Sequence, residues 1–155
     1  MRALTLAALL LVSTPAAAVA QTAPEAVAEA AIVVEARDFM ASYARDLLAG
    51  DRAAIAGRYD RQGAWMVHAG QSRFIAHDRI ARLYTEDWEA PSAFEWRDLV
   101  FIASGEDAVT VVGRFVWTPA GEEPVLIAYH GQFIRQDGQL RIRVEDETPV
   151  AAEMP

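Results

Sequence analysis

The sequence predicts a single domain of the α+β class, with helices first and a curved antiparallel sheet after them. Apolar residues recur at helical spacing up to Pro91, whereas long strand-like runs follow from Phe94 onward. Glycine-containing turn dipeptides separate these later runs. Because helices and hairpins are segregated along the chain, we expect the helices to cover one face of the sheet.

Three helices are expected before the long strands. The first covers about 29–49, because its apolar side chains step by three or four while charged ones line another side. Gly50 supplies a stop for this helix and Asp51 an N-cap for the next, so the two meet at a tight corner. A third helix opens at about residue 77. The apolar stripes of the three helices hold Ile32, Ala36, Phe39, Tyr43, Leu47, Ile55, Tyr59, Ile80, Leu83 and Tyr84.

Six strands are expected, two short and four long. The aromatic segment 63–69 favours a strand, and a turn over 70–72 leads to a brief second strand near 74–75. The long strands form an antiparallel meander, separated by turns at 105–106, 121–122 and 137–138. Their expected ranges are 94–103, 108–118, 125–135 and 139–147.

The first 20 residues have the pattern of a secretory signal peptide. Arg2 precedes a short apolar run, and small residues end at Ala20. The run is shorter than the roughly 20 residues that a membrane-spanning helix needs. We therefore expect cleavage after Ala20 and a soluble periplasmic or secreted protein without a membrane anchor. The mature chain divides into a leader (21–28), one domain (29–148) and a tail (149–155).

Composition excludes several classes of function. The net charge is −8, and it becomes −9 when Arg2 leaves with the signal peptide, so the surface repels nucleic acid and anionic lipid. The chain contains neither cysteine nor lysine, which excludes disulfides, thiolate sites and lysine Schiff bases. It also lacks the G-x-S-x-G, P-loop and dinucleotide-binding motifs. We expect no cofactor.

Three segments resemble the nuclear transport factor 2-like superfamily, whose members include ketosteroid isomerase, SnoaL-like polyketide cyclases and scytalone dehydratase. They are residues 43–59 (YARDLLAGDRAAIAGRY), 105–116 (GEDAVTVVGRFV) and 133–142 (FIRQDGQLRI). With the order of elements, the resemblance extends over about 30–148. It implies a cone, in which a bent sheet wraps around the helices and leaves a pocket at the wide end. It also implies a homodimer that pairs through the outer sheet face.

Only part of the ketosteroid isomerase site has a counterpart in this sequence. Tyr43, eight positions before Asp51, matches the tyrosine that donates a hydrogen bond to the substrate oxygen. The catalytic base would fall at Val67 and the second oxyanion-hole acid near Gly131, and neither has an ionisable side chain. The resemblance therefore speaks against ketosteroid isomerase chemistry while leaving the pocket in place.

The last hairpin determines which polar groups face that pocket. If residues 137–138 form a two-residue loop, Tyr129 lies opposite Asp146 on an inward face, and His130 lies opposite Glu145 on the outward face. A one-residue bulge would exchange the two sets. The inward residues expected are Tyr43, Trp65, Val67, Phe115, Trp117, Tyr129 and Asp146, either as pocket lining or as plain core.

The three histidines suggest a weaker alternative for the functional site, namely metal binding or acid–base catalysis. His68, His77 and His130 do not have the spacing of a metal site, so no metal is expected. His130 beside Glu145 resembles half of a catalytic dyad, although a polar pair on the outward face explains it as well.

Three functions are compatible with these features. The first is an exported domain that binds a small hydrophobic or cyclic molecule. The second is a cofactor-independent isomerase or lyase acting on a cyclic ketone or polyketide-like substrate, with Tyr43 as electrophile and Asp146 or His130 as base. The third is a non-enzymatic module that dimerises or interacts through the outer sheet face.

Overall fold

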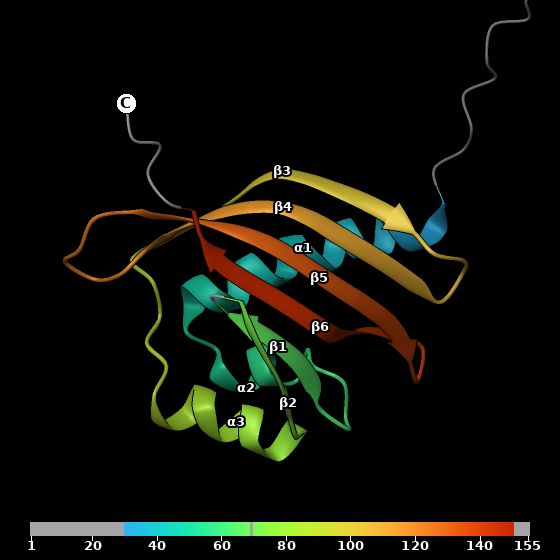
Figure 1. Ribbon diagram of the computed structural model, residues 1–155, viewed down its shortest axis with the longest axis horizontal. Coiled ribbons are helices and arrows are strands. Elements are labelled where there is room, and N and C mark those ends of the chain that lie inside the picture. Colours follow the sequence, from blue (N-terminus) through green and yellow to red (C-terminus); the bar gives the residue numbers. More distant parts are fainter. Residues whose placement is uncertain (1–29, 69, 151–155) are drawn as a thin grey trace, which may run out of the picture.

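The computed structural model describes residues 30–68 and 70–150. The expected signal peptide and leader, and residues 151–155 of the expected tail, lie outside this range. Figure 1 shows α1 crossing behind the long strands, with α2 and α3 next to a short hairpin. In the described part of the chain, no helix is long and apolar enough to cross a bilayer. The elements are α1 (Ala31–Ala49), α2 (Arg52–Ala56), β1 (Ala64–His68), β2 (Gln71–Ile75), α3 (His77–Glu86), β3 (Ala93–Ala103), β4 (Ala108–Thr118), β5 (Val125–Gln136) and β6 (Gln139–Pro149).

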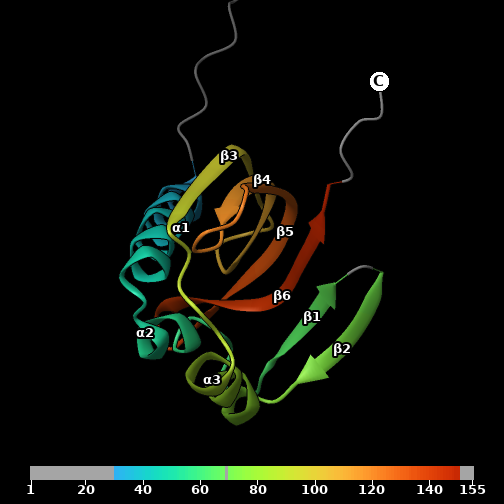
Figure 2. The same ribbon diagram turned by 90° about the vertical axis from the view of Figure 1, so that its left-hand side faces the viewer.

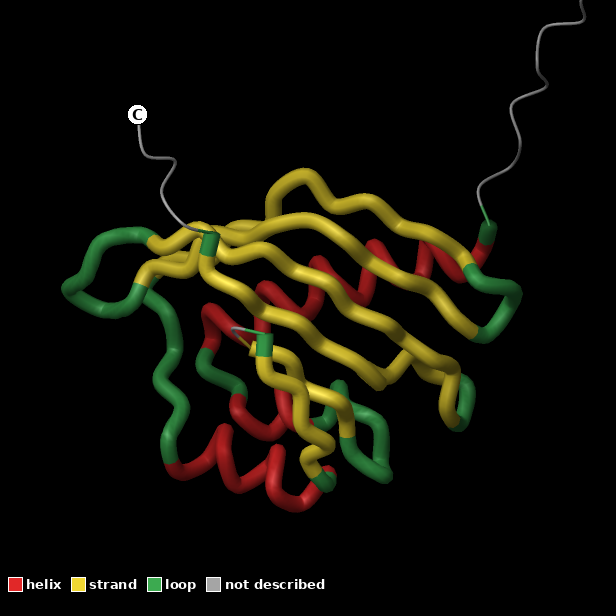
Figure 3. Tube along the Cα trace, in the orientation of Figure 1, coloured by secondary structure: helices red, strands yellow, loops and turns green. Residues whose placement is uncertain are grey.

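The six strands form one sheet in the order β2-β1-β6-β5-β4-β3. Strands β3 to β6 make the expected antiparallel meander, and β1 joins its edge by pairing in parallel with β6. Figures 2 and 3 show the long strands curving over α1 while the β1–β2 hairpin stands apart over α3. The predicted α+β cone, with helices inside a curved sheet, is confirmed.

The corner between the first two helices forms as expected. Gly50 adopts φ +67°, a left-handed conformation that ends α1 at little steric cost. The Asp51 side chain accepts a hydrogen bond from the Ala54 backbone N–H at 2.9 Å and so caps α2. The α2 helix ends at Ala56, earlier than predicted, and Tyr59 lies beyond it in a bridge with Ile142 of β6.

A bulge in β6 changes the register of the last hairpin. Gln136 faces Gln139 and Phe133 faces Ile142, as expected from the two-residue turn. The next pair is Gln132 with Val144, so Arg143 has no partner on β5.

Beyond the bulge, every β6 side chain lies on the face of the sheet opposite to the one that the regular register predicts. Tyr129 lies opposite Glu147, and His130 lies opposite Asp146. The predicted pairing of Tyr129 with Asp146 is therefore wrong. The bulge reverses the side chains of β6 but not those of β5. Glu145 and Glu147 therefore face inward beside Tyr129, while His130 stays on the outward face.

Asp60 holds the bulge in place from the loop after α2. Its side chain is fully buried and accepts hydrogen bonds from Arg143 and from the Gln62 backbone N–H. The Asp60 backbone N–H also donates to the Ile142 carbonyl at 3.0 Å. Burial raises the pKa of Asp60, but these hydrogen bonds and the Arg143 charge outweigh it and lower the pKa below its ordinary value. A charged, buried carboxylate therefore anchors the extra residue of β6.

Candidate functional site

An apolar cavity of about 250 Å³ lies between the helices and the concave face of the sheet. Seven of its ten lining side chains are aromatic, and Glu147 is the only charged one. We call it the aromatic cavity. Its lining residues are Tyr43, Leu47, Tyr84, Trp88, Phe94, Trp96, Phe115, Trp117, Ile127 and Glu147.

Strand alternation places the aromatic wall. Phe115 and Trp117 are two residues apart on β4, so their side chains share a face. On β3, Phe94 lies opposite Trp117 and Trp96 lies opposite Phe115. The four rings contact one another across the strands, with Phe94 and Phe115 stacked at 5.2 Å between centroids. The Trp96 indole N–H donates to the Met40 carbonyl at 3.0 Å, which joins this wall to α1.

A cluster of tyrosine hydroxyls and carboxyls lies at one end of the aromatic cavity. Tyr59 donates a short hydrogen bond to Glu145, and the Tyr129 hydroxyl lies 3.3 Å from the other Glu145 oxygen. The Tyr59 oxygen also lies 3.3 Å from the Tyr43 hydroxyl and 2.8 Å from the Tyr84 hydroxyl. The Tyr59 hydroxyl therefore links α1 and α3 to Glu145 of β6, and Glu145 also binds Tyr129 of β5.

The protonation of Glu145 determines the direction of these hydrogen bonds. A phenol has one proton, so when Tyr59 donates to an ionised Glu145, Tyr43 and Tyr84 must donate to Tyr59. A protonated Glu145 can instead donate to Tyr59, and Tyr59 can then donate towards Tyr84. The hydroxyls that line the cavity can therefore donate or accept.

Both inward carboxyls hold their protons more tightly than usual. Burial raises the pKa of Glu145 to about 7, although the hydrogen bonds from Tyr59 and Tyr129 lower it. Burial, together with the charges of Glu145 and Asp146, raises the pKa of Glu147 to about 8. Each of these two carboxyl groups therefore changes its protonation state near neutral pH.

Gly131 makes room for the Tyr129 hydroxyl. A Cβ atom at this position would lie 2.6 Å from the Tyr129 oxygen and 2.8 Å from the Phe133 ring. Any side chain here would therefore push Tyr129 away from Glu145.

A second, more polar cavity of about 420 Å³ lies on the other side of the two carboxyls. Met66, His68 and Arg73 of the β1–β2 hairpin line it together with Glu145 and Glu147. His68 is held by a 2.8 Å hydrogen bond between its Nδ1 and the Glu147 carbonyl oxygen. Glu147 thus borders both cavities.

The structure brings together only some of the residues predicted for the site. Tyr43, Phe115 and Trp117 line the aromatic cavity. Tyr129 is buried behind it and binds Glu145.

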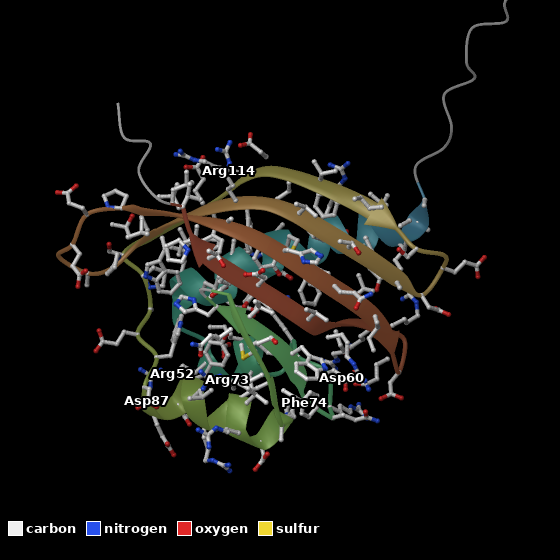
Figure 4. The ribbon with its side chains drawn as sticks, in the orientation of Figure 1. Arg52, Asp60, Arg73, Phe74, Asp87 and Arg114 are labelled. Atoms are coloured by element: carbon white, nitrogen blue, oxygen red, sulfur yellow. The ribbon has the colours of Figure 1, made fainter. Side chains whose placement is uncertain are left out.

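Two further predicted inward residues, Trp65 and Val67, alternate with Ala64 and Met66 along β1 and do not line the aromatic cavity. The predicted inward placement of Trp65 is wrong, whereas Val67 is half-buried. Trp65 is 47% exposed and packs against Phe74, which Figure 4 marks on β2. Of the two cavities, Val67 borders only the second.

The two predicted bases also lie away from the aromatic cavity. Asp146 is on the outward face, where it accepts a hydrogen bond from the Thr148 hydroxyl at 2.9 Å. Its predicted inward placement is wrong because the bulge turns it outward. His130, also a candidate base, is exposed opposite Asp146 and not opposite Glu145. Within the described ranges, no cluster of three or more metal-binding side chains is present.

No family model matches this chain, and no curated protein matches it. Solved structures do resemble it. An NTF-2 like protein of unknown function from Shewanella oneidensis aligns with a TM-score of 0.66 and 13% identity, over 74% of this chain and 97% of its own. A cystatin-like fold protein from Burkholderia xenovorans aligns with a TM-score of 0.65 and 18% identity, over 80% and 94%. An NTF2-like protein with a cystatin-like fold from Novosphingobium aromaticivorans aligns with a TM-score of 0.59 and 17% identity, over 77% and 82%.

This chain has the nuclear transport factor 2-like fold. Within this fold the two positions that the resemblance assigned to acids lie at Val67, which borders the second cavity, and at Gly131, which has no side chain. Glu145 and Glu147 of β6 supply the carboxyls of this nuclear transport factor 2-like domain instead.

The inward placement of the groups that give the site its chemistry could not be predicted from the sequence. Glu145 and Glu147 flank Asp146, so a register shift of one residue still places an acid inward, and the sequence pattern alone cannot distinguish the two registers. The sequence places Tyr59 and Tyr84 on the apolar stripes of two expected helices, and it therefore predicts that both are core residues. Their hydroxyl contacts depend on the distant Glu145.

Proposed function

We propose that this domain binds a small hydrophobic molecule that contains a ring, in the aromatic cavity. The observation that carries the proposal is a cavity of about 250 Å³ with seven aromatic side chains in its wall. Ligand pockets are typically concave and apolar with few polar groups, and here the hydroxyls of Tyr43 and Tyr84 and the Glu147 carboxyl fill that role.

Isothermal titration with 2-naphthol tests this proposal. We expect saturable binding with one site per chain and a rise in melting temperature, because a ligand that binds only the folded state stabilises it. The variant I127W places a larger side chain on the cavity wall and should abolish binding. The matched control V34W adds the same ring on the exposed side of α1, where Val34 is 47% exposed, and should bind normally. Equal binding by both variants, or none by the unmodified protein, contradicts the proposal.

A second candidate function is proton transfer on a cyclic ketone, favoured by the pair Glu145 and Glu147. A base works best when its pKa lies near the operating pH, and burial raises the pKa of Glu147 to about 8. Glu147 would remove a proton from the carbon next to the carbonyl, and Tyr43 or Tyr84 would donate a hydrogen bond to the enolate oxygen. Return of the proton to another carbon completes an isomerisation.

Deuterium exchange into 2-tetralone, followed by NMR in D2O, measures the first step of this reaction. We expect E147Q to slow the exchange by about 100-fold or more, since a positioned base contributes about that factor. D146N removes the neighbouring carboxylate on the outward face, which contributes least of the three causes to the raised pKa of Glu147, and should change the rate far less than E147Q does. An unchanged rate in E147Q excludes Glu147 as the base.

We further propose that the protein is exported and forms a homodimer through the outer sheet face. Export rests on the signal-peptide pattern of residues 1–20. Expression of the full chain in a Gram-negative host, with mass spectrometry of the periplasmic fraction, should give a protein that begins at Gln21. The dimer is supported by exposed apolar side chains on the outer face, where Val100 and Ile102 of β3 adjoin Val112 of β4.

A further inference from the structure

The single charged group of the aromatic cavity has no counter-charge there. Glu147 forms no hydrogen bond or ion pair through its side chain with any residue in the described ranges, and no arginine or histidine lines the cavity. Glu147 is half-buried, and without a partner its ionised form costs free energy. An occupant that carries a positive charge would remove this cost.

Other rings that line the same cavity favour the same kind of occupant. Trp117, Trp88 and Tyr84 form a continuous row, with ring centroids 6.1 Å apart for the first pair and 5.7 Å for the second. Aromatic rings attract cations to their faces, and tryptophan does so most strongly. A cavity that combines several such rings with one carboxylate suits an alkylammonium group better than a neutral or anionic one.

The groups around Glu147 add negative charge and little positive charge. Glu145, two residues before it on β6, is buried behind the tyrosines of α1, α3 and β5. Those tyrosines stay neutral, because burial raises their pKa values well above the ordinary range. His68 of β1 contacts the Glu147 backbone, and Arg73 of β2 is exposed on the wall of the second cavity.

We propose that the aromatic cavity binds an organic cation, namely a quaternary or protonated amine carried on a small apolar body. The ammonium group would lie beside Glu147 and against Trp88 and Trp117. This inference rests on the proposed function, since it concerns the same cavity, and it adds the chemical class of the ligand.

Two probes of equal shape separate charge from size. Choline and 3,3-dimethylbutan-1-ol differ mainly in whether the branched centre is a positive nitrogen or a neutral carbon. We expect isothermal titration to show that the unmodified protein prefers choline by at least about tenfold. E147Q should reduce the preference below about threefold, whereas D146N, which loses the same charge on the other face of β6, should keep it.

A second variant guards against an indirect effect of the glutamine. W117L removes one ring of the row while leaving Glu147 in place, and it should weaken choline more than the neutral alcohol. Loss of both ligands to the same degree would mean that Trp117 only shapes the cavity.

The pH dependence gives an independent signature. An ammonium beside Glu147 competes with the proton that burial holds there, so choline should bind more tightly as the pH rises from 6 to 9. Titrations in two buffers of different ionisation enthalpy should show proton release on binding. Glu145 and His68 also lie nearby. E147Q separates their contribution because it should lose most of the proton release, whereas D146N should lose only a minor part, since Asp146 is the smallest of the three causes that raise the pKa of Glu147.

Each result bears on one of the two proposals. Equal affinity for the two probes, tighter binding of the alcohol, or an unchanged preference in E147Q overturns the organic-cation inference. Binding of 2-naphthol without binding of either probe also overturns it while leaving the ring-binding proposal in place. Failure of all three compounds to bind removes the ring-binding proposal as well.

Discussion

At the scale of single residues, Glu147 has the most consequential environment in the molecule. It is the one charged group in a wall of aromatic side chains, and burial with the nearby charges of Glu145 and Asp146 raises its pKa to about 8. A group that binds its proton more tightly in the folded than in the unfolded state makes stability depend on pH. Glu147 therefore links the chemistry of the cavity to the stability of the fold.

The variant E147Q should change this dependence in a defined direction. Glutamate has a pKa near 4.5 when unperturbed, so between pH 4.5 and about 8 the folded state binds more protons and stability falls as the pH rises. Glutamine removes the part due to Glu147. We expect E147Q to equal the unmodified protein at pH 4 and to be more stable by about 2 kcal/mol at pH 9 in urea unfolding, which is less than the full pKa shift would give because Glu147 is only half-buried and solvent screens its charge. D146N should show a weaker trend in the same direction, because the Asp146 charge contributes only part of the raised pKa of Glu147. A constant difference between E147Q and the unmodified protein would contradict the prediction.

At the scale of elements, the β6 bulge decides which acids face the cavities. Arg143 is the extra residue, and it binds the buried carboxylate of Asp60, a residue 83 positions earlier in the chain. The loop after α2 also contacts β6 beside the bulge, where the Asp60 backbone N–H donates to the Ile142 carbonyl. The local twist of β6 thus depends on a contact with a segment distant in sequence.

The variant D60N tests this support. The amide keeps the shape of the side chain but removes the charge that Arg143 binds, so we expect a loss of about 2 kcal/mol in the free energy of unfolding at pH 7. D137N provides the control, because Asp137 pairs with Arg61 while 58% of its side chain is exposed. Exposed pairs contribute little, and D137N should cost less than about 0.5 kcal/mol. Similar losses for both variants would show that the Asp60 contact does not hold the bulge.

At the scale of the whole molecule, the two faces of the sheet have different surroundings. The concave face packs on α1 and holds both carboxyls, whereas the outer face carries exposed apolar side chains beside His130 and Asp146. An exposed apolar surface is typical of an interface. The homodimer that we propose would bury this face and leave the aromatic cavity open.

Light scattering at micromolar concentration tests the proposed dimer. The unmodified protein should have twice the mass of one chain, and I102E should shift it to the monomer because it places a charge in the apolar patch. V34E introduces the same charge on the exposed side of α1, where Val34 is 47% exposed, and should leave the dimer intact. A monomeric unmodified protein contradicts the proposal.

The sequence by itself determined the order and type of the elements and most of their limits. The exceptions include α2, which ends at Ala56, and β2, which begins at Gln71 where a turn was predicted. Local signals were sufficient for this, since Gly50 and Asp51 act within one turn of backbone and Asp137 and Gly138 form a two-residue loop. Only the tertiary structure decided which acid faces inward. A strand has a period of two, so one extra residue reverses every later side chain, and the acids at 145–147 fit either register. The contact between Asp60 and Arg143 selects the register that places Glu145 and Glu147 beside the tyrosines.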